Sequence, residues 1–193
     1  LSKAAGMSPI LVCVAHPDDE CFLGASLARF ASEGHQVYVL ALADGETSRF
    51  GATQDDVLAR LSNQCAAAKV LGCEVLNGKG HPLGGPVFRD QRLDVAPLLE
   101  ITRVIEAAIA KVKPSIVYTH SPGDLNADHR RVYEAVLPAV RPKNGVREVY
   151  CFAGPRMIRF EPTSFWAVTE AQIAQQHEAL KCYGDELAGE WDL

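Results

Sequence analysis

The chain has 193 residues, of which 48% are hydrophobic and 22% charged, as expected for one globular domain with a sizeable core. Its formal net charge of -5 lacks the basic excess of nucleic-acid-binding proteins, so no nucleic-acid partner is expected. No stretch approaches the roughly 18 consecutive apolar residues of a transmembrane helix. The six cysteines form no Cys-x-x-Cys pair, which favours reduced thiols and a cytoplasmic location.

The first residues do not resemble a signal peptide, because they carry one positive charge and no long apolar region. Met7 is interpreted as the native start, and residues 1–6 as a disordered or appended extension. A single domain is therefore expected over residues 7–193. The sequence leaves the oligomeric state open, a homo-oligomer included.

Five apolar runs and five stretches with helical spacing share the chain. In chain order they predict a strand at 10–15, a helix at 20–33, a strand at 37–43, a helix at 55–71, a strand at 74–76, a helix at 97–112, a strand at 115–119, a helix at 129–137, a strand at 147–153 and a helix at 170–183. Pro138 is expected to end the fourth helix. This alternation predicts an α/β fold, a Rossmann-like three-layer sandwich with a mainly parallel sheet.

Polar residues follow several predicted strands. His16 comes after the first strand, Asp44 after the second and His120 after the fourth. In parallel α/β sheets, ligands bind beyond the carboxyl ends of the strands. We therefore expect these side chains to share one functional rim.

The segment Ala15-His16-Pro17-Asp18-Asp19-Glu20 places a histidine and three acids directly after an apolar strand. Adjacent acids repel one another unless a positive charge lies among them, and a divalent cation would supply it. A histidine and a carboxylate three residues apart can both bind one zinc ion. The segment therefore predicts part of a metal site, with His16 and Asp19 as ligands.

A second acidic cluster, Asp124-Leu125-Asn126-Ala127-Asp128-His129, is expected at the same rim and supplies His129 as a third ligand. Catalytic zinc usually keeps three protein ligands and one open position for water. Asp18 is then the candidate general base for that water. From spacing alone, Asp18 and Asp19 could exchange roles.

For several other residues, a purely structural role is an alternative to a functional one. Asp128 is a candidate cap for the helix at 129–137, and could also orient His129. His120 is either a strand end without a role or part of the site. Arg49 and Asp90, in predicted loops, are either solvated charges or contacts for a substrate.

The first motif resembles the signature of the LmbE-like, PIG-L type deacetylases. That family includes the de-N-acetylases of N-acetylglucosaminyl-phosphatidylinositol and the deacetylases of mycothiol and bacillithiol biosynthesis. The likeness covers most of the chain, through the segments Asp44–Arg49, Arg60–Gly72, Tyr118–His120, Asp128–Arg130 and Ala179–Tyr183.

The resemblance implies zinc as the cofactor, with His16, Asp19 and His129 as ligands and Asp18 as the general base. It also implies that Arg49 and Asp90 contact sugar hydroxyls. The family's second motif is usually His-x-Asp-His, but here its first position is Asn126. Asparagine can donate a hydrogen bond to an oxyanion but is a poor proton donor, so His120 or the protonated Asp18 is the candidate acid.

The expected activity is removal of the acetyl group from an N-acetylated amino sugar: a free sugar, a sugar nucleotide or a glycoside. Two alternatives stay open. One is a zinc amidase that acts on a larger acyl conjugate, and the other is a non-catalytic sugar-binding protein on the same fold. A nucleotide-binding redox protein is disfavoured, because no Gly-x-Gly-x-x-Gly follows the first strand.

Overall fold

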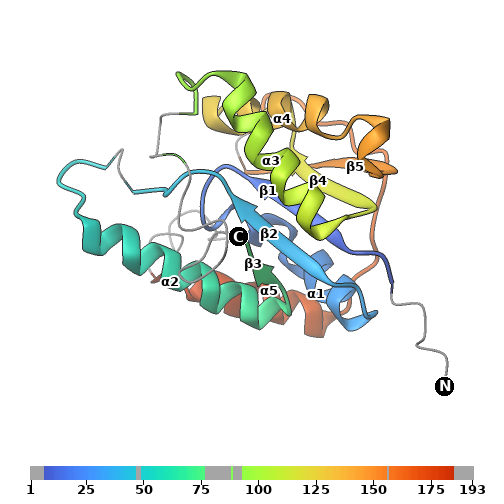
Figure 1. The fold of residues 1–193 in the computed structure, drawn as a ribbon. Helices are drawn as coiled ribbons and strands as arrows, with labels where there is room; N and C mark the ends of the chain where they lie inside the picture. The colour runs from blue at the N-terminus through green and yellow to red at the C-terminus, as the bar shows by residue number, and fades with distance from the viewer. Residues whose placement is uncertain (1–6, 47–48, 77–87, 89–92, 156, 185–193) are drawn as a thin grey trace.

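The computed structural model describes residues 7–46, 49–76, 88, 93–155 and 157–184 (Figure 1). Within this part of the chain, five parallel strands form one sheet in the order β3-β2-β1-β4-β5. The strands are β1 (Ile10–Val14), β2 (Val37–Ala41), β3 (Glu74–Val75), β4 (Ile116–His120) and β5 (Glu148–Phe152). The prediction of an α/β fold with a parallel sheet is confirmed.

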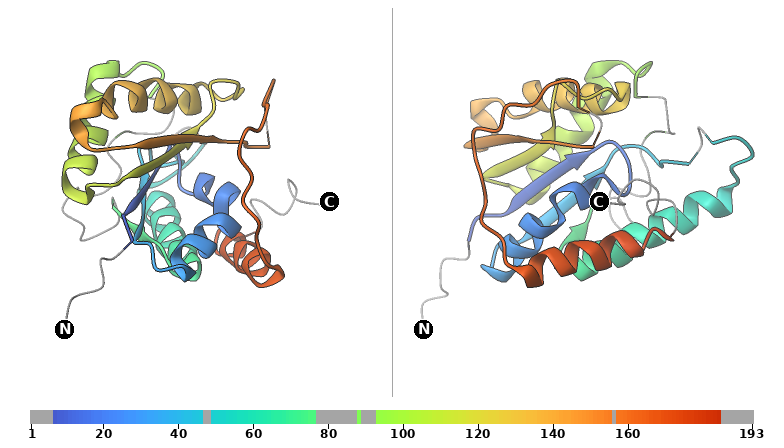
Figure 2. Two further views of the ribbon diagram at one scale, coloured as in Figure 1. Left: turned by 90° about the vertical axis from the view of Figure 1, so that its right-hand side faces the viewer. Right: turned by 180° about the vertical axis from the view of Figure 1, so that it is seen from behind.

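Helices cover both faces of the sheet and complete three layers. The helices are α1 (Gly24–Ser32), α2 (Gln54–Leu71), α3 (Leu98–Val112), α4 (Ala127–Ala139) and α5 (Glu170–Lys181), with short 3-10 turns η1 (Asp19–Leu23) and η2 (Pro142–Asn144). Figures 1 and 2 show α3 and α4 together on one face, and α1, α2 and α5 on the other. None of the helices described combines the length and the apolar character that a membrane span needs.

The central strand β1 is apolar throughout because each of its faces is covered. Ile10, Val12 and Val14 pack into the core beneath α1 and α5. Leu11 and Cys13 point to the opposite face, into the core beneath α3 and α4. Side chains alternate between the faces of a strand, so a strand buried on both sides reads as one continuous apolar run.

Several predicted helix boundaries are wrong, two of them for a clear physical reason. The helix expected at 20–33 is divided into η1 and α1, since the carbonyl of Cys21 accepts a hydrogen bond at 2.7 Å from the Gln176 side chain of α5. Pro138 does not end α4, which continues to Ala139. In the last turn of a helix a proline removes one backbone hydrogen bond only, and the helix is ending there already.

Gly72 and Gly145 provide a matched test of how tightly the helices pack. Both have positive φ, 74° and 80°, so alanine costs about 1–2 kcal/mol at either position. A Cβ at Gly72 would also lie 2.8 Å from the Ala31 Cβ of α1, whereas one at Gly145 would meet nothing within 4 Å. We expect Gly72→Ala to lower the free energy of unfolding by about 1–3 kcal/mol more than Gly145→Ala does. Urea denaturation measures both, and equal losses would contradict the close contact.

Candidate active site

The polar residues of the two motifs meet where the strand order reverses. β1 lies at the centre of the sheet. β2 and β3 follow on one side of β1, and β4 and β5 lie on its other side. His16 follows β1, His120 ends β4, and His129 stands in the first turn of α4. Open parallel sheets bind ligands at this switch point, and the fold brings these three histidines together there.

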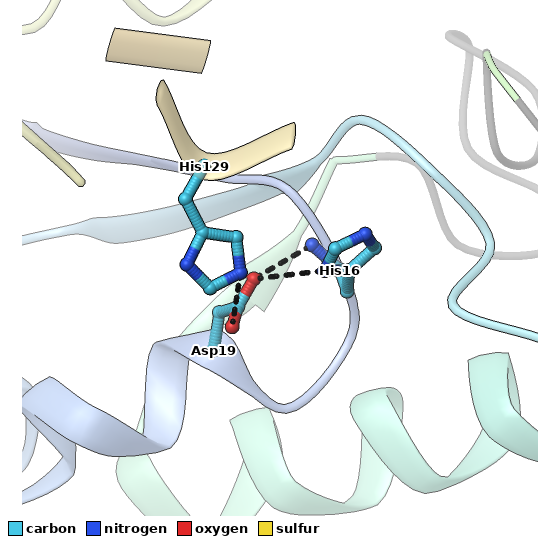
Figure 3. Close-up of side chains that lie close together, drawn as sticks. All are labelled: His16, Asp19 and His129. Atoms are coloured by element: carbon cyan, nitrogen blue, oxygen red, sulfur yellow. Dashed lines mark hydrogen bonds and ion pairs between the residues drawn. The ribbon is translucent and has the colours of Figure 1, made fainter. Parts of the chain in front are cut away.

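The three predicted ligands converge around the Asp19 carboxylate (Figure 3). Their ligand atoms all lie within 4.8 Å of one another. His129 Nε2 is 3.3 Å from Asp19 Oδ1, and His16 Nδ1 is 3.5 Å from Asp19 Oδ2. Tetrahedral zinc with ligand bonds near 2.0–2.1 Å separates its ligands by about 3.3 Å. The donor set therefore fits such a cation in both chemistry and spacing.

Each ligand histidine also faces a second acid through its other nitrogen. His16 Nε2 lies 3.2 Å from Asp128 Oδ2, and His129 Nδ1 lies 2.9 Å from Asp124 Oδ2. Metal-binding histidines commonly donate their second N–H to a carboxylate, which fixes the tautomer and the ring. Both imidazoles are thus oriented with one nitrogen toward Asp19.

Burial and charge favour the ionised forms of the facing pair. Burial raises the pKa of Asp19, but the neighbouring rings of His129 and His120 outweigh it and hold that pKa well below its usual range. Burial lowers the pKa of His129, but Asp19 and Asp124 raise it to about 9. An imidazole between two carboxylates attracts a cation, and a divalent ion can take the place of its proton.

Asp18 lies next to this group and contacts α2. Its Oδ2 accepts a hydrogen bond at 2.5 Å from Arg60 Nη2. Burial and the adjacent charge of Asp19 raise its pKa to about 8, against the opposing effect of Arg60. A carboxylate whose pKa lies near neutrality suits a group that takes and returns a proton. The two neighbouring acids thus have different partners, Arg60 for Asp18 and His129 for Asp19.

Arg60 had no assigned role in the sequence and is a central contact of the site. Its guanidinium is buried and also donates to Glu46 Oε1 and the Pro17 carbonyl, both at 3.1 Å. The sequence does hint at this role, because Arg60 stands next to Leu61 and one turn from Val57 on the buried face of α2. Asp124 was likewise not expected to contact His129, although both belong to the second acidic cluster.

His120 lies behind the ligands, with 1% of its side chain exposed. Its Nε2 accepts a hydrogen bond at 2.9 Å from the Ala15 N–H, and burial lowers its pKa. The neutral ring stacks on His129, with centroids 3.9 Å apart. His120, Asp124 and His129 also form a metal-sized group, but the Nε2 of His120 accepts the Ala15 N–H.

The start of α4 differs from the prediction. Its N-cap is Asn126, whose Oδ1 accepts the Asp128 N–H at 2.9 Å. The expectation that Asp128 caps a helix at 129–137 is therefore wrong, and Asp128 orients His16 instead of His129. The cap occupies the oxygen of the Asn126 amide and leaves its NH₂ as the donating end.

The two predicted substrate residues have different outcomes. Arg49 has 45% of its side chain exposed, and its Nε lies 3.6 Å from Glu46 Oε2. It therefore stands at the rim, beside the acid that Arg60 also contacts. Asp90 lies outside the described residues.

Known proteins match this chain in sequence and in fold. The family model PIG-L, described as GlcNAc-PI de-N-acetylase, matches residues 11–140. An Escherichia coli protein named as an uncharacterized deacetylase, YaiS, is 30% identical, and the match covers 94% of this chain and 93% of that protein. A Rhodococcus erythropolis 1D-myo-inositol 2-acetamido-2-deoxy-alpha-D-glucopyranoside deacetylase is also 30% identical, with 86% of this chain and 63% of that protein covered.

Among solved structures, the conserved protein TT1542 from Thermus thermophilus superposes with a TM-score of 0.72 at 25% identity, over 92% of this chain and 79% of that one. The family match includes His16, Asp18, Asp19, Arg60 and His129, the residues that the fold brings together. The chain belongs to the PIG-L family of GlcNAc-PI de-N-acetylase-like proteins.

Proposed function

We propose that the protein is a zinc-dependent hydrolase that removes the acetyl group from an N-acetylated amino sugar. The observation that carries this proposal is the pairing of two histidines with separate acids around one shared carboxylate, with Asp18 held beside them by Arg60. This arrangement supplies a cation site and a proton acceptor next to each other, as amide hydrolysis requires.

A bound zinc ion would supply a Lewis acid that polarises the amide carbonyl and makes water a better nucleophile. Asp18 takes one proton from the attacking water as the oxygen bonds to the carbonyl carbon. The NH₂ of Asn126 donates a hydrogen bond to the developing oxyanion. Asp18 then returns its proton to the nitrogen as the C–N bond breaks, which yields acetate and a free amine.

We assign the returning proton to Asp18 and not to His120. The Nε2 lone pair of His120 accepts the Ala15 N–H, and the ring is buried behind the ligands. His120 would therefore support the ligand His129 by packing. Asp128 and Asp124 would hold the tautomers of the two ligand histidines.

The substrate class is an acetamido sugar or its glycoside. The Rhodococcus relatives, whose names describe an inositol-linked acetamido sugar, support this class. Arg49 at the rim would bind sugar hydroxyls, as would Asp90. The six free thiols support a reducing, cytoplasmic compartment.

The direct test measures acetate and free amine released from N-acetylglucosamine, its α-glycosides and its nucleotide diphosphate form, with and without a chelator. Release that stops on chelation and returns with Zn²⁺ is expected. Preference for a longer N-acyl chain would favour the larger-acyl amidase. Zinc-loaded protein that binds the sugars without releasing acetate would favour the sugar-binding alternative.

Asp18→Asn tests the assigned base. Asparagine keeps the shape of Asp18 but cannot accept the water proton, so kcat should fall about 10²- to 10⁴-fold with little change in zinc affinity. Asp94→Asn makes the same chemical change at an exposed position and should keep full activity. Near-normal turnover of the Asp18 variant would remove it from the mechanism.

Asp124→Asn tests the support of His129. The neutral amide is a weaker acceptor for the His129 Nδ1–H, so zinc affinity should fall about 10- to 100-fold in a competition titration with a chelator. The Asp94→Asn variant again serves as the control. An unchanged affinity would show that this contact does not support a metal ligand.

A further inference from the structure

We infer that Glu20 and Tyr183 are positioning residues that hold Asp18 in its working orientation. This inference rests on the proposed function, in which Asp18 moves the proton. Glu20 belongs to the first motif, but neither residue has a role in the mechanism derived above.

Asp18 needs such support because its backbone is strained. Its φ is 109°, one of two positive values among the described residues other than glycine. Side chains disfavour this region, so the conformation persists only when the surroundings fix it. The next residue is the ligand Asp19, and a relaxed Asp18 would turn its carboxylate away from the reacting water.

Glu20 fixes the backbone of Asp18. Its Oε2 accepts the Asp18 N–H at 3.0 Å, and its Oε1 accepts the Tyr183 hydroxyl at 2.5 Å. Glu20 has no exposed surface and Tyr183 has 3%. A carboxylate with both oxygens engaged in a core has little freedom to move.

Tyr183 also contacts the partner of the Asp18 side chain. The Arg60 guanidinium lies over the Tyr183 ring, 5.7 Å from its centroid, and donates to Asp18 Oδ2. The hydroxyl of Tyr183 thus acts on the backbone of Asp18 through Glu20, and its ring acts on the carboxylate through Arg60. Tyr183, just beyond the end of α5, therefore contacts both Glu20, which binds the Asp18 backbone, and Arg60, which binds the Asp18 carboxylate.

Packing alone does not call for this arrangement. Tyr183 belongs to the apolar core beneath α1 and α5, which a phenylalanine would fill equally well. Burying the Glu20 carboxylate near Asp18 and Asp19 is unfavourable unless hydrogen bonds compensate it. The hydrogen bonds from Tyr183 and Asp18 supply that compensation, and they also fix the loop.

Tyr183→Phe keeps the ring over Arg60 and removes only the hydroxyl. We expect kcat to fall about 10- to 100-fold, the effect typical of a small misplacement of a reacting group. KM and zinc affinity should stay within about twofold, because the His16 N–H still holds Asp19 Oδ2 at 2.8 Å. Tyr118→Phe, a buried tyrosine of the same core packed against Phe30 and Tyr150, should keep full kcat.

Two further variants separate positioning from general stability. Glu20→Gln retains an oxygen for the Asp18 N–H and an NH₂ for the Tyr183 hydroxyl, so it should keep most of kcat, whereas Glu20→Ala should lose it. In the Asp18→Asn background, Tyr183→Phe should have no further effect on the residual rate. Full kcat in Tyr183→Phe, or losses that multiply with those of Asp18→Asn, would overturn the inference.

A crystal structure of Tyr183→Phe tests the inference without turnover. Asp18 should shift from the φ of 109°, because the Glu20 carboxylate that accepts its N–H is no longer held by the hydroxyl; an unchanged Asp18 would refute the positioning role. If the wild-type protein releases no acetate from any sugar, the proposed function fails, and this structural result still decides the role of Tyr183.

Discussion

A buried negative charge organises the site. Asp19 is almost fully buried, and a lone carboxylate in such a place is strongly unfavourable. Imidazole nitrogens of His16, His120 and His129 lie 3.3–3.5 Å from its oxygens. They come from the β1 loop, β4 and α4, so the charge joins segments more than one hundred residues apart. The topology makes this possible, because β1 and β4 are neighbours at the switch point.

The fold was predictable because its signals are local. Strands buried on both faces appear as apolar runs, and glycine and capping patterns mark several helix ends. The division of η1 from α1 was not predictable, since Gln176, from the other end of the chain, contacts the Cys21 carbonyl. The N-cap at Asn126 was missed for a different reason: Asp128 is an equally good capping residue, and composition does not rank the two.

The three candidate ligands could be inferred from the sequence because each lies in a short acidic motif after a strand. The residues that hold these side chains in place could not be inferred in this way. Arg60 meets Asp18 across 42 residues and Tyr183 meets Glu20 across 163, and no periodicity in the chain connects either pair. Asp124 is near His129 in sequence, but only the geometry of the turn before α4 shows which acid faces which histidine.

The division of labour between Asp18 and Asp19 follows from one backbone angle. Consecutive carboxylates repel each other unless their side chains enter different surroundings. The positive φ of Asp18 turns its side chain toward Arg60 and α2, while Asp19 faces the histidines of β4 and α4. One carboxylate is thereby free of the cation site and the other belongs to it. The strain at Asp18 is thus the condition for placing the candidate proton acceptor directly beside a candidate metal ligand, and the contacts that maintain this strain are as much a part of the site as those ligands.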